Sequence, residues 1–302
     1  MPVRVLTIKI SPLLTILAFF INLLSAVFGL TSNSFVLIWF CMEIRMFSFI
    51  IILLLYQHNL RNSYVVKYFM FQAFSSVVLI LSLCKGIIFN DILFLVTIIK
   101  LGAAPFHGWF IGIVEKISLR HFFWMAVPQK IIPLRLVQAM SLPRTRFNKI
   151  LLVRVLLACV HIVTQFKFIK ILAASSIYLT PWILFSFFVS DIIRWIFFAA
   201  YSFLQARVLV LVFKIKAKAD PLNNKYRSVS YYGILLLVLL IAGFPPRPLF
   251  FIKLRILLYL FLVKFRLSAI MLILIASIGI FTYLNIVRIR VIIRFRQQRV
   301  NL

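Results

Sequence analysis

One apolar run restricts the folds open to this chain more than any other feature of the sequence. No charged residue occurs between Ile10 and Met42, and a helix needs only about 20 apolar residues to cross the hydrocarbon core of a bilayer. The rest of the chain has the same character, because 64% of its 302 residues are hydrophobic and 13% are charged. A soluble domain is about half apolar and about a quarter charged. The sequence therefore predicts an all-α integral membrane protein and excludes the soluble fold classes.

Further apolar segments predict about 10–11 transmembrane helices in one polytopic membrane domain of residues 1–302. Polar or basic linkers are expected at Pro143–Lys149 and Lys214–Ser230, and a basic tail from Arg288 to Arg299. The positive-inside rule places the second linker and the tail on the cytosolic or matrix side. The expected helices are Ser11–Leu30, Ser34–Tyr56, Lys67–Cys84, Ile87–Ala104, Phe110–Ile117, Phe122–Met140, Ile150–Phe166, Lys170–Val189, Ile193–Phe213, Tyr231–Ala242, Ile252–Leu262 and Leu267–Val287.

Basic residues greatly outnumber acidic ones, with 34 Lys and Arg against 5 Asp and Glu. Such a bias often indicates nucleic-acid binding. Here, however, the cations are spread between and inside apolar segments and form no single solvated patch. Positive loops on the negative side of a membrane explain the bias better. We therefore expect membrane lipids, and no nucleic acid, among the partners of this chain.

The sequence lacks the patterns typical of metal, disulfide and nucleotide sites. Cys41, Cys84 and Cys159 lie in apolar sequence and form no Cys-x-x-Cys pair, and no Gly-x-Gly-x-x-Gly or phosphate loop occurs. Arg4 and Lys9 precede the first apolar run in the manner of a signal peptide. That run is too long and has no evident cleavage site, so we interpret it as a retained helix. The absence of an Arg- and Ser-rich transit segment fits a chain synthesised inside the organelle or cell that uses it.

Glu43 and Lys100 are the strongest functional candidates, because a charge inside a bilayer is costly. Glu43 lies in the middle of the apolar segment Ser34–Tyr56, and burial favours its protonated form unless a cation is near. Lys100 stands just before Gly102, two alanines and Pro105, a sequence typical of a broken helix beside water. Burial disfavours the charged lysine and a nearby Glu favours it, so both residues are candidate proton carriers. The alternatives are a structural ion pair for Glu43 and a snorkelling lysine for Lys100.

Two further lysines are proton-transfer candidates beside helix-breaking residues. Lys130 lies between Pro128 and Pro133, and two prolines in one apolar segment predict a kinked or unwound helix. Lys253 follows the breaker cluster Gly243–Pro246. Each of these lysines is equally well explained, taken alone, as a residue at the edge of a loop.

Two histidines are weaker candidates for proton transfer, because an unperturbed imidazole titrates near neutrality. His107 stands next to the broken-helix sequence and is the better candidate. His161 is more simply explained as a hydrogen-bonded core or interface residue.

Six motifs follow one another along most of the chain, from about Trp39 to Lys253. They are Trp39 with Glu43 and Ser48, Lys67–Ala73 with Ser75, Lys100–His107 with Trp109, Gln129–Pro133, Lys170–Ile177 with Trp182, and Gly243–Pro246 with Lys253. Their order and spacing resemble those of the antiporter-like membrane subunits of respiratory complex I, the NADH–ubiquinone oxidoreductase. Within that family the chain is most similar to subunit 2, because subunits 4 and 5 are much longer and differ around the lysines.

This resemblance implies an antiporter-like fold with broken helices near the membrane midplane, and a role in coupling NADH oxidation by ubiquinone to proton translocation. It implies that Glu43 pairs with Lys100, that Lys130 continues the polar axis, and that Lys253 lies towards the exit or the next subunit. It also implies that this chain holds no redox cofactor, and that NADH, FMN, iron–sulfur clusters and ubiquinone bind other subunits. Neighbouring antiporter-like subunits and the mitochondrial inner membrane are its implied surroundings.

The sequence departs from the family pattern at several positions. Pro128 stands where the family usually has Trp before the Gln–Lys pair, and Leu249 stands where it usually has Gly. Arg45, Arg135 and Arg247 occupy positions where the family usually carries small or uncharged residues.

Arginines inside apolar segments suggest a hypothesis about the gene. Charge is costly at such positions, and the five acidic residues of the chain provide too few internal partners. If AGA or AGG codons of an invertebrate mitochondrial gene were translated with the standard code, several of these arginines are serines in the native protein. CGN codons at these positions would contradict the idea. The alternative is a truly basic protein whose arginines meet lipid phosphates and acidic neighbours. The arginines concerned are Arg45, Arg135, Arg154 and Arg255.

The sequence also fits two other classes of function. A stand-alone cation/proton antiporter shares the fold and the pairing of Lys with Glu, but the short chain and the order of the motifs argue against it. A structural membrane subunit whose lysines no longer conduct is the second alternative, which the altered residues around Lys130 leave open.

Overall fold

The computed structural model describes residues 12–56, 63–84, 90–140, 144–165, 168–217, 243–244 and 248–300. Within these ranges the regular structure is helical and no β-strand occurs. Six of the described helices are long and apolar enough to cross a membrane. The predicted all-α, multi-pass membrane fold is confirmed, while the expected helix Tyr231–Ala242 lies outside the described residues.

The chain divides into two compact units. One comprises residues 1–102 and 106–142, and the other comprises residues 103–105 and 143–302. The single polytopic domain expected for residues 1–302 stays a prediction.

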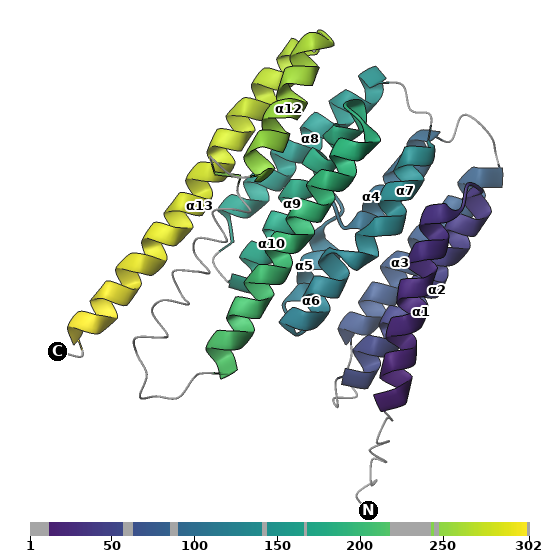
Figure 1. Cartoon of the computed structure of the whole chain (residues 1–302), viewed down its shortest axis with the longest axis horizontal. Coiled ribbons are helices and arrows are strands. Elements are labelled where there is room, and N and C mark those ends of the chain that lie inside the picture. The colour runs from purple at the N-terminus through teal and green to yellow at the C-terminus, as the bar shows by residue number, and fades with distance from the viewer. Residues whose placement is uncertain are drawn as a thin grey trace, which may run out of the picture. The chain divides into compact units, whose positions relative to one another are not determined.

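In the first unit, α2 packs against α1, α3 and α7, and α4 packs against α3 and α7 (Figure 1). Apolar residues of these helices, such as Ile38, Phe49 and Leu79, are fully buried. The elements are α1 (Pro12–Thr31), α2 (Phe35–Tyr56), α3 (Ser63–Cys84), α4 (Asn90–Leu101), α5 (Gly108–Val114), α6 (Leu119–Ala126), the 3-10 turn η2 (Pro128–Lys130) and α7 (Ile131–Ala139).

Two breaks interrupt the helices of the first unit, and both are at residues that sequence analysis identified as breakers. Helix α4 ends at Leu101, and Gly102 follows with a φ of +61°, a left-handed conformation that glycine adopts without steric cost. The apolar segment predicted as Phe122–Met140 is divided by the 3-10 turn η2, which begins at Pro128. The breaks leave Lys100 and Lys130 at helix ends, where main-chain polar groups lack intrahelical partners.

In the second unit, α9 is the most deeply buried helix, because every residue from Ile171 to Ser186 is buried. Helix α9 packs against α8 and α10, and α13 packs against α8 and α12 (Figure 1). The elements are α8 (Arg144–Val163), α9 (Phe168–Phe185), the 3-10 turn η3 (Ser186–Phe188), α10 (Asp191–Ala217), α12 (Pro248–Leu262) and α13 (Arg266–Val300).

Three expectations about the second unit were wrong. Residues 144–149 belong to α8 and not to a linker, and α13 continues through the basic tail to Val300. Arg and Lys are good helix formers, so basic residues need not end a helix. The resemblance implied a broken helix at Lys170–Ile177, but α9 is continuous to Phe185 and includes Pro181. A proline inside a membrane helix is tolerated where neighbouring groups satisfy the carbonyl it frees.

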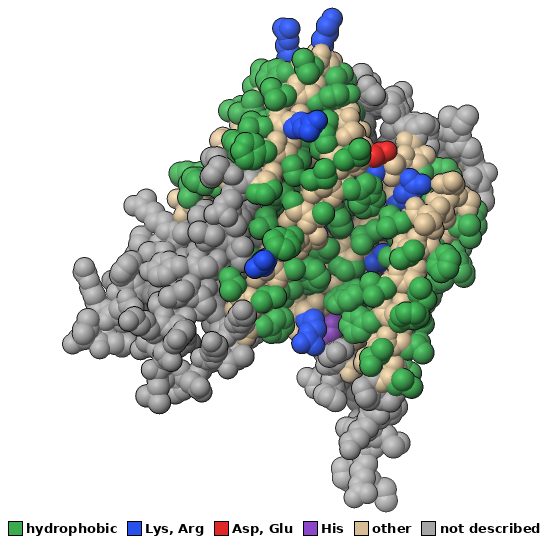
Figure 2. Space-filling model, viewed as in Figure 1, with side chains coloured by type: hydrophobic (Ala, Val, Ile, Leu, Met, Phe, Trp, Pro, Cys, Tyr) green, Lys and Arg blue, Asp and Glu red, His purple; other side chains and the backbone are tan. Residues whose placement is uncertain are grey.

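Apolar side chains dominate the described surface in Figure 2, and charged side chains are few and scattered there. Large apolar residues on α1 are strongly exposed, among them Leu13, Ile16 and Phe28. Helix α13 shows the same feature at Leu267 and Phe281. A soluble protein rarely exposes so much contiguous apolar surface, so these faces are suited to acyl chains or to other membrane helices.

Gly29 provides a test of the packing in the first unit. A Cβ at Gly29 would lie 2.8 Å from Cδ1 of Ile132 and 3.2 Å from Cβ of Cys41, so α1 approaches α2 and α7 without room for a side chain. We expect Gly29→Ala to destabilise the protein by about 1–3 kcal/mol through overpacking. Thermal unfolding of the purified protein, followed by loss of helical circular dichroism, measures this.

Gly112 is the matched control, because it lies inside α5 with nothing within 4 Å of the position of its Cβ. Gly112→Ala should be neutral or stabilising by about 0.5–1 kcal/mol, since Ala is the better helix former. Equal effects of the two substitutions would contradict the proposed close packing.

Candidate functional site

An ion pair joins α2 and α4 inside the first unit. Nζ of Lys100 lies 3.3 Å from Oε1 of Glu43. The side chains are 2% and 14% exposed, respectively. Burial removes the water that would otherwise solvate both charges, so each depends on the other for stabilisation. The pairing implied by the resemblance is therefore present in the structure.

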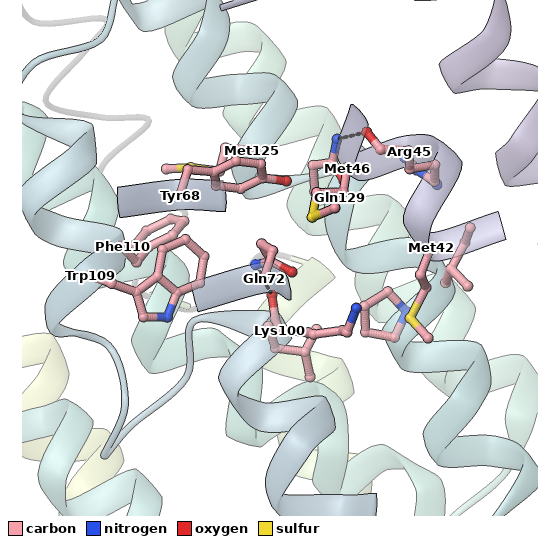
Figure 3. Close-up of a pocket in the computed structure, with 13 residues that line it drawn as sticks. Met42, Arg45, Met46, Tyr68, Gln72, Lys100, Trp109, Phe110, Met125 and Gln129 are labelled. Atoms are coloured by element: carbon pink, nitrogen blue, oxygen red, sulfur yellow. Dashed lines mark hydrogen bonds between the residues drawn. The ribbon is translucent and has the colours of Figure 1, made fainter. Parts of the chain in front are cut away.

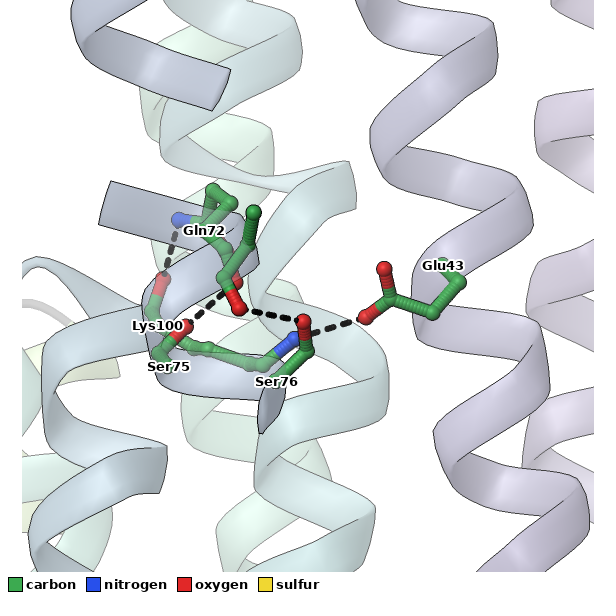
Figure 4. A network of polar contacts seen from close by, with 6 residues as sticks. Glu43, Gln72, Ser75, Ser76 and Lys100 are labelled. Atoms are coloured by element: carbon green, nitrogen blue, oxygen red, sulfur yellow. Dashed lines mark hydrogen bonds and ion pairs between the residues drawn. The ribbon is translucent and has the colours of Figure 1, made fainter. Parts of the chain in front are cut away.

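Lys100 is held from α3 as well as from α2. Nε2 of Gln72 donates to the main-chain carbonyl of Lys100 at 3.4 Å, and this carbonyl is one of those that the end of α4 leaves without an intrahelical partner. The Ser75 hydroxyl donates to the Gln72 carbonyl at 2.7 Å. In Figure 4, Gln72 and Ser75 lie by the main chain of Lys100, and Ser76 lies by its amine, which points towards Glu43. The break after Leu101 and the polar face of α3 together fix the position of Lys100.

A cavity adjoins the ion pair in the first unit (Figure 3). Its polar lining comprises Lys100, Arg45, Gln72, Gln129 and Tyr68, which stand among methionine and aromatic side chains. The cavity is large enough to hold at least one water molecule, and these groups supply the two to four polar contacts that an internal water needs. It is thus suited to hydrate the inner side of Lys100.

Lys130 lies at the second helix break, beyond this cavity. Lys130 is the last residue of η2 and immediately precedes α7, and it is 2% exposed. Its Nζ lies 5.7 Å from the centroid of the Phe110 ring. Phe110 and Gln129, the neighbour of Lys130 in sequence, both line the cavity. The cavity therefore lies between the surroundings of Lys100 and those of Lys130.

Lys253 occupies the core of the second unit. It is 5% exposed on α12, and its Nζ lies 5.2 Å and 5.1 Å from the ring centroids of Tyr178 and Trp182 on α9. Aromatic faces attract a cation. Gly243 has a φ of +84°, and a Cβ there would lie 3.0 Å from this Nζ. Glycine thus allows the main chain to approach the lysine closely.

The two histidine candidates have less defined surroundings. His107 is half-buried at the N-terminal end of α5, beside the break that follows Lys100. His161 falls within α8, and its side chain lies outside the described residues. Their role in proton transfer stays a prediction.

Sequence reasoning missed several polar residues around the lysines. Gln72 was part of a motif, but nothing in the sequence indicated that it binds the carbonyl of Lys100. The buried tyrosines Tyr178, Tyr201 and Tyr283 were not identified, although a hydroxyl in an apolar segment is a signal for a buried polar contact. Arg194 was also missed; it is fully buried and forms an ion pair with Asp191 at 2.7 Å.

The arginines predicted inside apolar segments have different surroundings. Arg45 and Arg154 are each 2% exposed, whereas Arg255 is exposed. Arg135 is half-buried and donates to Oδ1 of Asn33 at 3.2 Å. Only two of the four positions are therefore deeply buried, and the hypothesis of misread serine codons applies most strongly to these two.

The arrangement in the first unit can hold, release and reload a proton. When a carboxylate and a lysine are in contact, the charge on one stabilises the charged form of the other. A polar cavity next to the lysine can admit water. Among the described residues, no group of three or more His, Cys, Asp or Glu has the arrangement of a metal site.

The chain resembles known proteins over most of its length, although no family model matches it. It is 30% identical to NADH-ubiquinone oxidoreductase chain 2 of Rhipicephalus sanguineus, over 87% of this chain and 85% of that protein. The chain 2 proteins of Lumbricus terrestris and Anopheles gambiae are each 28% identical. The match to the Lumbricus terrestris protein covers 88% of this chain and 83% of that protein. The match to the Anopheles gambiae protein covers 75% of this chain and 72% of that protein.

A solved structure has a similar fold. The chain superimposes with a TM-score of 0.74 on a chain of respiratory complex I from Thermus thermophilus with bound aureothin. The match covers 90% of this chain and 69% of the other, at 13% sequence identity. At this identity the similarity shows the fold alone.

Arg45 yields a testable prediction about stability. Its Nη2 donates to Oδ1 of Asn22 at 3.4 Å, while Nε and Nη1 have no hydrogen-bond partner among the described residues. A buried charge with so few partners lowers the free energy of unfolding by an amount on the order of several kcal/mol. We expect Arg45→Ser to raise the thermal unfolding midpoint of the purified protein, because the gain from removing the charge exceeds the cost of the small cavity left behind.

Arg207 gives the matched control, because it is exposed on α10. Arg207→Ser should leave the midpoint nearly unchanged. A fall in the midpoint on Arg45→Ser alone would show that an acidic partner or lipid stabilises Arg45.

Tryptic peptides of the native protein test the codon hypothesis directly. Cleavage after position 45 indicates arginine, and an uncleaved peptide with serine at position 45 confirms the misread codon.

Proposed function

The chain belongs to the NADH–ubiquinone oxidoreductase chain 2 family, and from this premise we propose that its buried carboxylate and lysines carry protons through the membrane domain of respiratory complex I. It is a subunit of an enzyme complex and a multi-pass protein of the mitochondrial inner membrane. The observation that carries the proposal is the buried ion pair of Glu43 and Lys100, with Nζ and Oε1 3.3 Å apart.

The redox chemistry of the enzyme belongs to other subunits in this proposal. NADH, FMN, the iron–sulfur clusters and ubiquinone bind elsewhere in the complex, and this chain contributes residues that bind and release protons. Its partners are then other membrane subunits of complex I, especially neighbouring antiporter-like subunits, together with membrane lipids. The exposed apolar faces of α1 and α13 support contacts of this kind.

Proton movement begins at the ion pair of the first unit. While Glu43 is ionised and close, it stabilises the ammonium form of Lys100. When the carboxylate moves away or becomes protonated, desolvation favours the neutral amine, and Lys100 releases its proton. The pair thus converts a change of charge or position at Glu43 into a proton released at Lys100.

The cavity supplies a route for the released proton towards Lys130. Gln72 and Gln129 can orient water in the cavity, because an amide both donates and accepts hydrogen bonds. Lys130 is buried beyond the cavity, and its charged form disfavours a second positive charge on Lys100. Loading one lysine therefore favours unloading the other, and the change at Glu43 decides which of the two is unloaded.

Lys253 is the corresponding residue of the second unit. Two aromatic rings of α9 hold its amine in place and exclude bulk water. Its protonation would then be controlled by neighbouring groups rather than by solvent. We propose that it serves as the last lysine of the path in this chain.

Neutralising Lys100 tests the proposal. In purified complex I reconstituted into vesicles, Lys100→Met should lower the initial rate of proton pumping at saturating NADH at least about tenfold, because general acid–base groups contribute large rate factors. The quenching of a pH-sensitive dye measures pumping. Lys116→Met, at an exposed lysine after α5, is the matched control and should pump at the wild-type rate.

Lys100→Met leaves Glu43 buried without its cation, which can destabilise the protein by about 3–5 kcal/mol. The double variant Glu43→Gln with Lys100→Met removes both charges and should assemble normally on a native gel, yet still fail to pump. Wild-type pumping by the assembled double variant would favour a structural subunit that no longer conducts.

A further inference from the structure

Three buried tyrosines converge in the core of the second unit, from α9, α10 and α13. Tyr178, Tyr201 and Tyr283 are each 1% exposed or less. Nε2 of Gln205 lies 3.3 Å from the hydroxyl of Tyr201 and 3.4 Å from Oγ of Ser175. The hydroxyl of Tyr283 also lies near Ser175. Ser175 and Gln205 thus connect Tyr201 with Tyr283, which are far apart in the sequence.

The hydroxyls of this tyrosine cluster have unused hydrogen-bonding capacity. Neither Tyr178 nor Tyr283 makes a well-formed hydrogen bond with its hydroxyl to the described residues. A buried polar group without a partner is costly, and in native proteins ordered water usually supplies the missing contact. The core of the second unit therefore favours water among the tyrosine hydroxyls, at a depth where the surrounding residues are apolar.

The tyrosine cluster adjoins Lys253. The ring of Tyr178 lies 5.2 Å from Nζ of Lys253. At the hydroxyl of the same tyrosine, a Cβ at Gly279 would lie only 2.8 Å away. Gly279 therefore leaves room on α13 for that hydroxyl. Tyr178 also lies close enough to Tyr283 to interact with it electrostatically, so Tyr178 stands between the lysine and the cluster.

We propose that the cluster of Tyr178, Tyr201, Tyr283, Ser175 and Gln205 is a proton-transfer branch that loads and unloads Lys253. This inference rests on the proposed function, because it assigns Lys253 a partner for proton exchange in the second unit. No acidic residue is needed in such a branch, which suits a chain with five acids in total.

The proton balance of the branch is simple. A proton supplied by water enters at one end of the cluster. Each hydroxyl accepts a proton on its oxygen and gives up its own, so one O–H bond forms, one breaks, and the group is neutral before and after. Gln205 orients the chain by donating to Tyr201 and Ser175 and does not change its own protonation. The transferred proton ends on the neutral amine of Lys253, which becomes an ammonium ion against the rings of Tyr178 and Trp182.

Removing single hydroxyls tests the branch in purified complex I reconstituted into vesicles. Tyr201→Phe and Tyr283→Phe keep the rings that fill the core and delete only the hydroxyls. Each should slow NADH-driven proton pumping about tenfold, a modest part of the roughly 10²–10⁴-fold that proton-transfer groups contribute. The solvent isotope effect on pumping should also rise, because proton transfer becomes the slow step. Ser175→Ala provides a smaller variant if a tyrosine variant fails to assemble.

Tyr259→Phe is the matched control, because Tyr259 is a half-buried tyrosine on α12 outside the cluster. It should pump at the wild-type rate with an unchanged isotope effect. Wild-type pumping by Tyr201→Phe and Tyr283→Phe, together with loss of pumping in Lys253→Met, would overturn the branch and leave the proposed function intact. Wild-type pumping by Lys253→Met would overturn the proposed role of Lys253 itself.

Discussion

The contact between Glu43 and Lys100 determines how the polar interior of the first unit is arranged. Two charges buried between α2 and α4 have little water to stabilise them, so each fixes the preferred protonation of the other. An apolar membrane helix normally excludes a carboxylate, and the lysine makes the position of Glu43 tolerable. The same mutual dependence makes the pair responsive, since any change at one residue alters the energy of the proton on the other.

The arrangement around the pair follows from where the helices break. Gly102 ends α4, and Pro128 divides the segment that contains Lys130, so that both lysines lie at helix ends with free main-chain groups nearby. Gln72 from α3 binds one of these carbonyls. In the second unit the polar groups are instead hydroxyls and aromatic rings around Lys253. Acidic residues are few in this chain, so neutral donors and acceptors provide most of the polar contacts inside it.

Sequence patterns predicted the helical membrane fold and the main charged residues, because a long apolar run or a charge within one has few physical explanations. The partner of Glu43 was reached only through resemblance, since 57 residues separate it from Lys100. The roles of Gln72 and the tyrosine cluster could not be predicted, because neutral polar residues occur in many membrane helices and only the packing of several helices brings them together. The course of α13 was misjudged because basic residues are compatible with both a linker and a helix. The identity of residue 45 depends on the codons of the gene.

Infrared difference spectroscopy of purified complex I during turnover with NADH, comparing the wild type with Glu43→Gln, tests most directly whether Glu43 exchanges protons. If Glu43 takes up and releases a proton, the wild type should show a C=O band of a protonated carboxyl that appears during turnover and is absent in the variant. If the two difference spectra are the same in this region, Glu43 keeps one protonation state throughout, and its contact with Lys100 is a structural ion pair rather than a step in proton transfer.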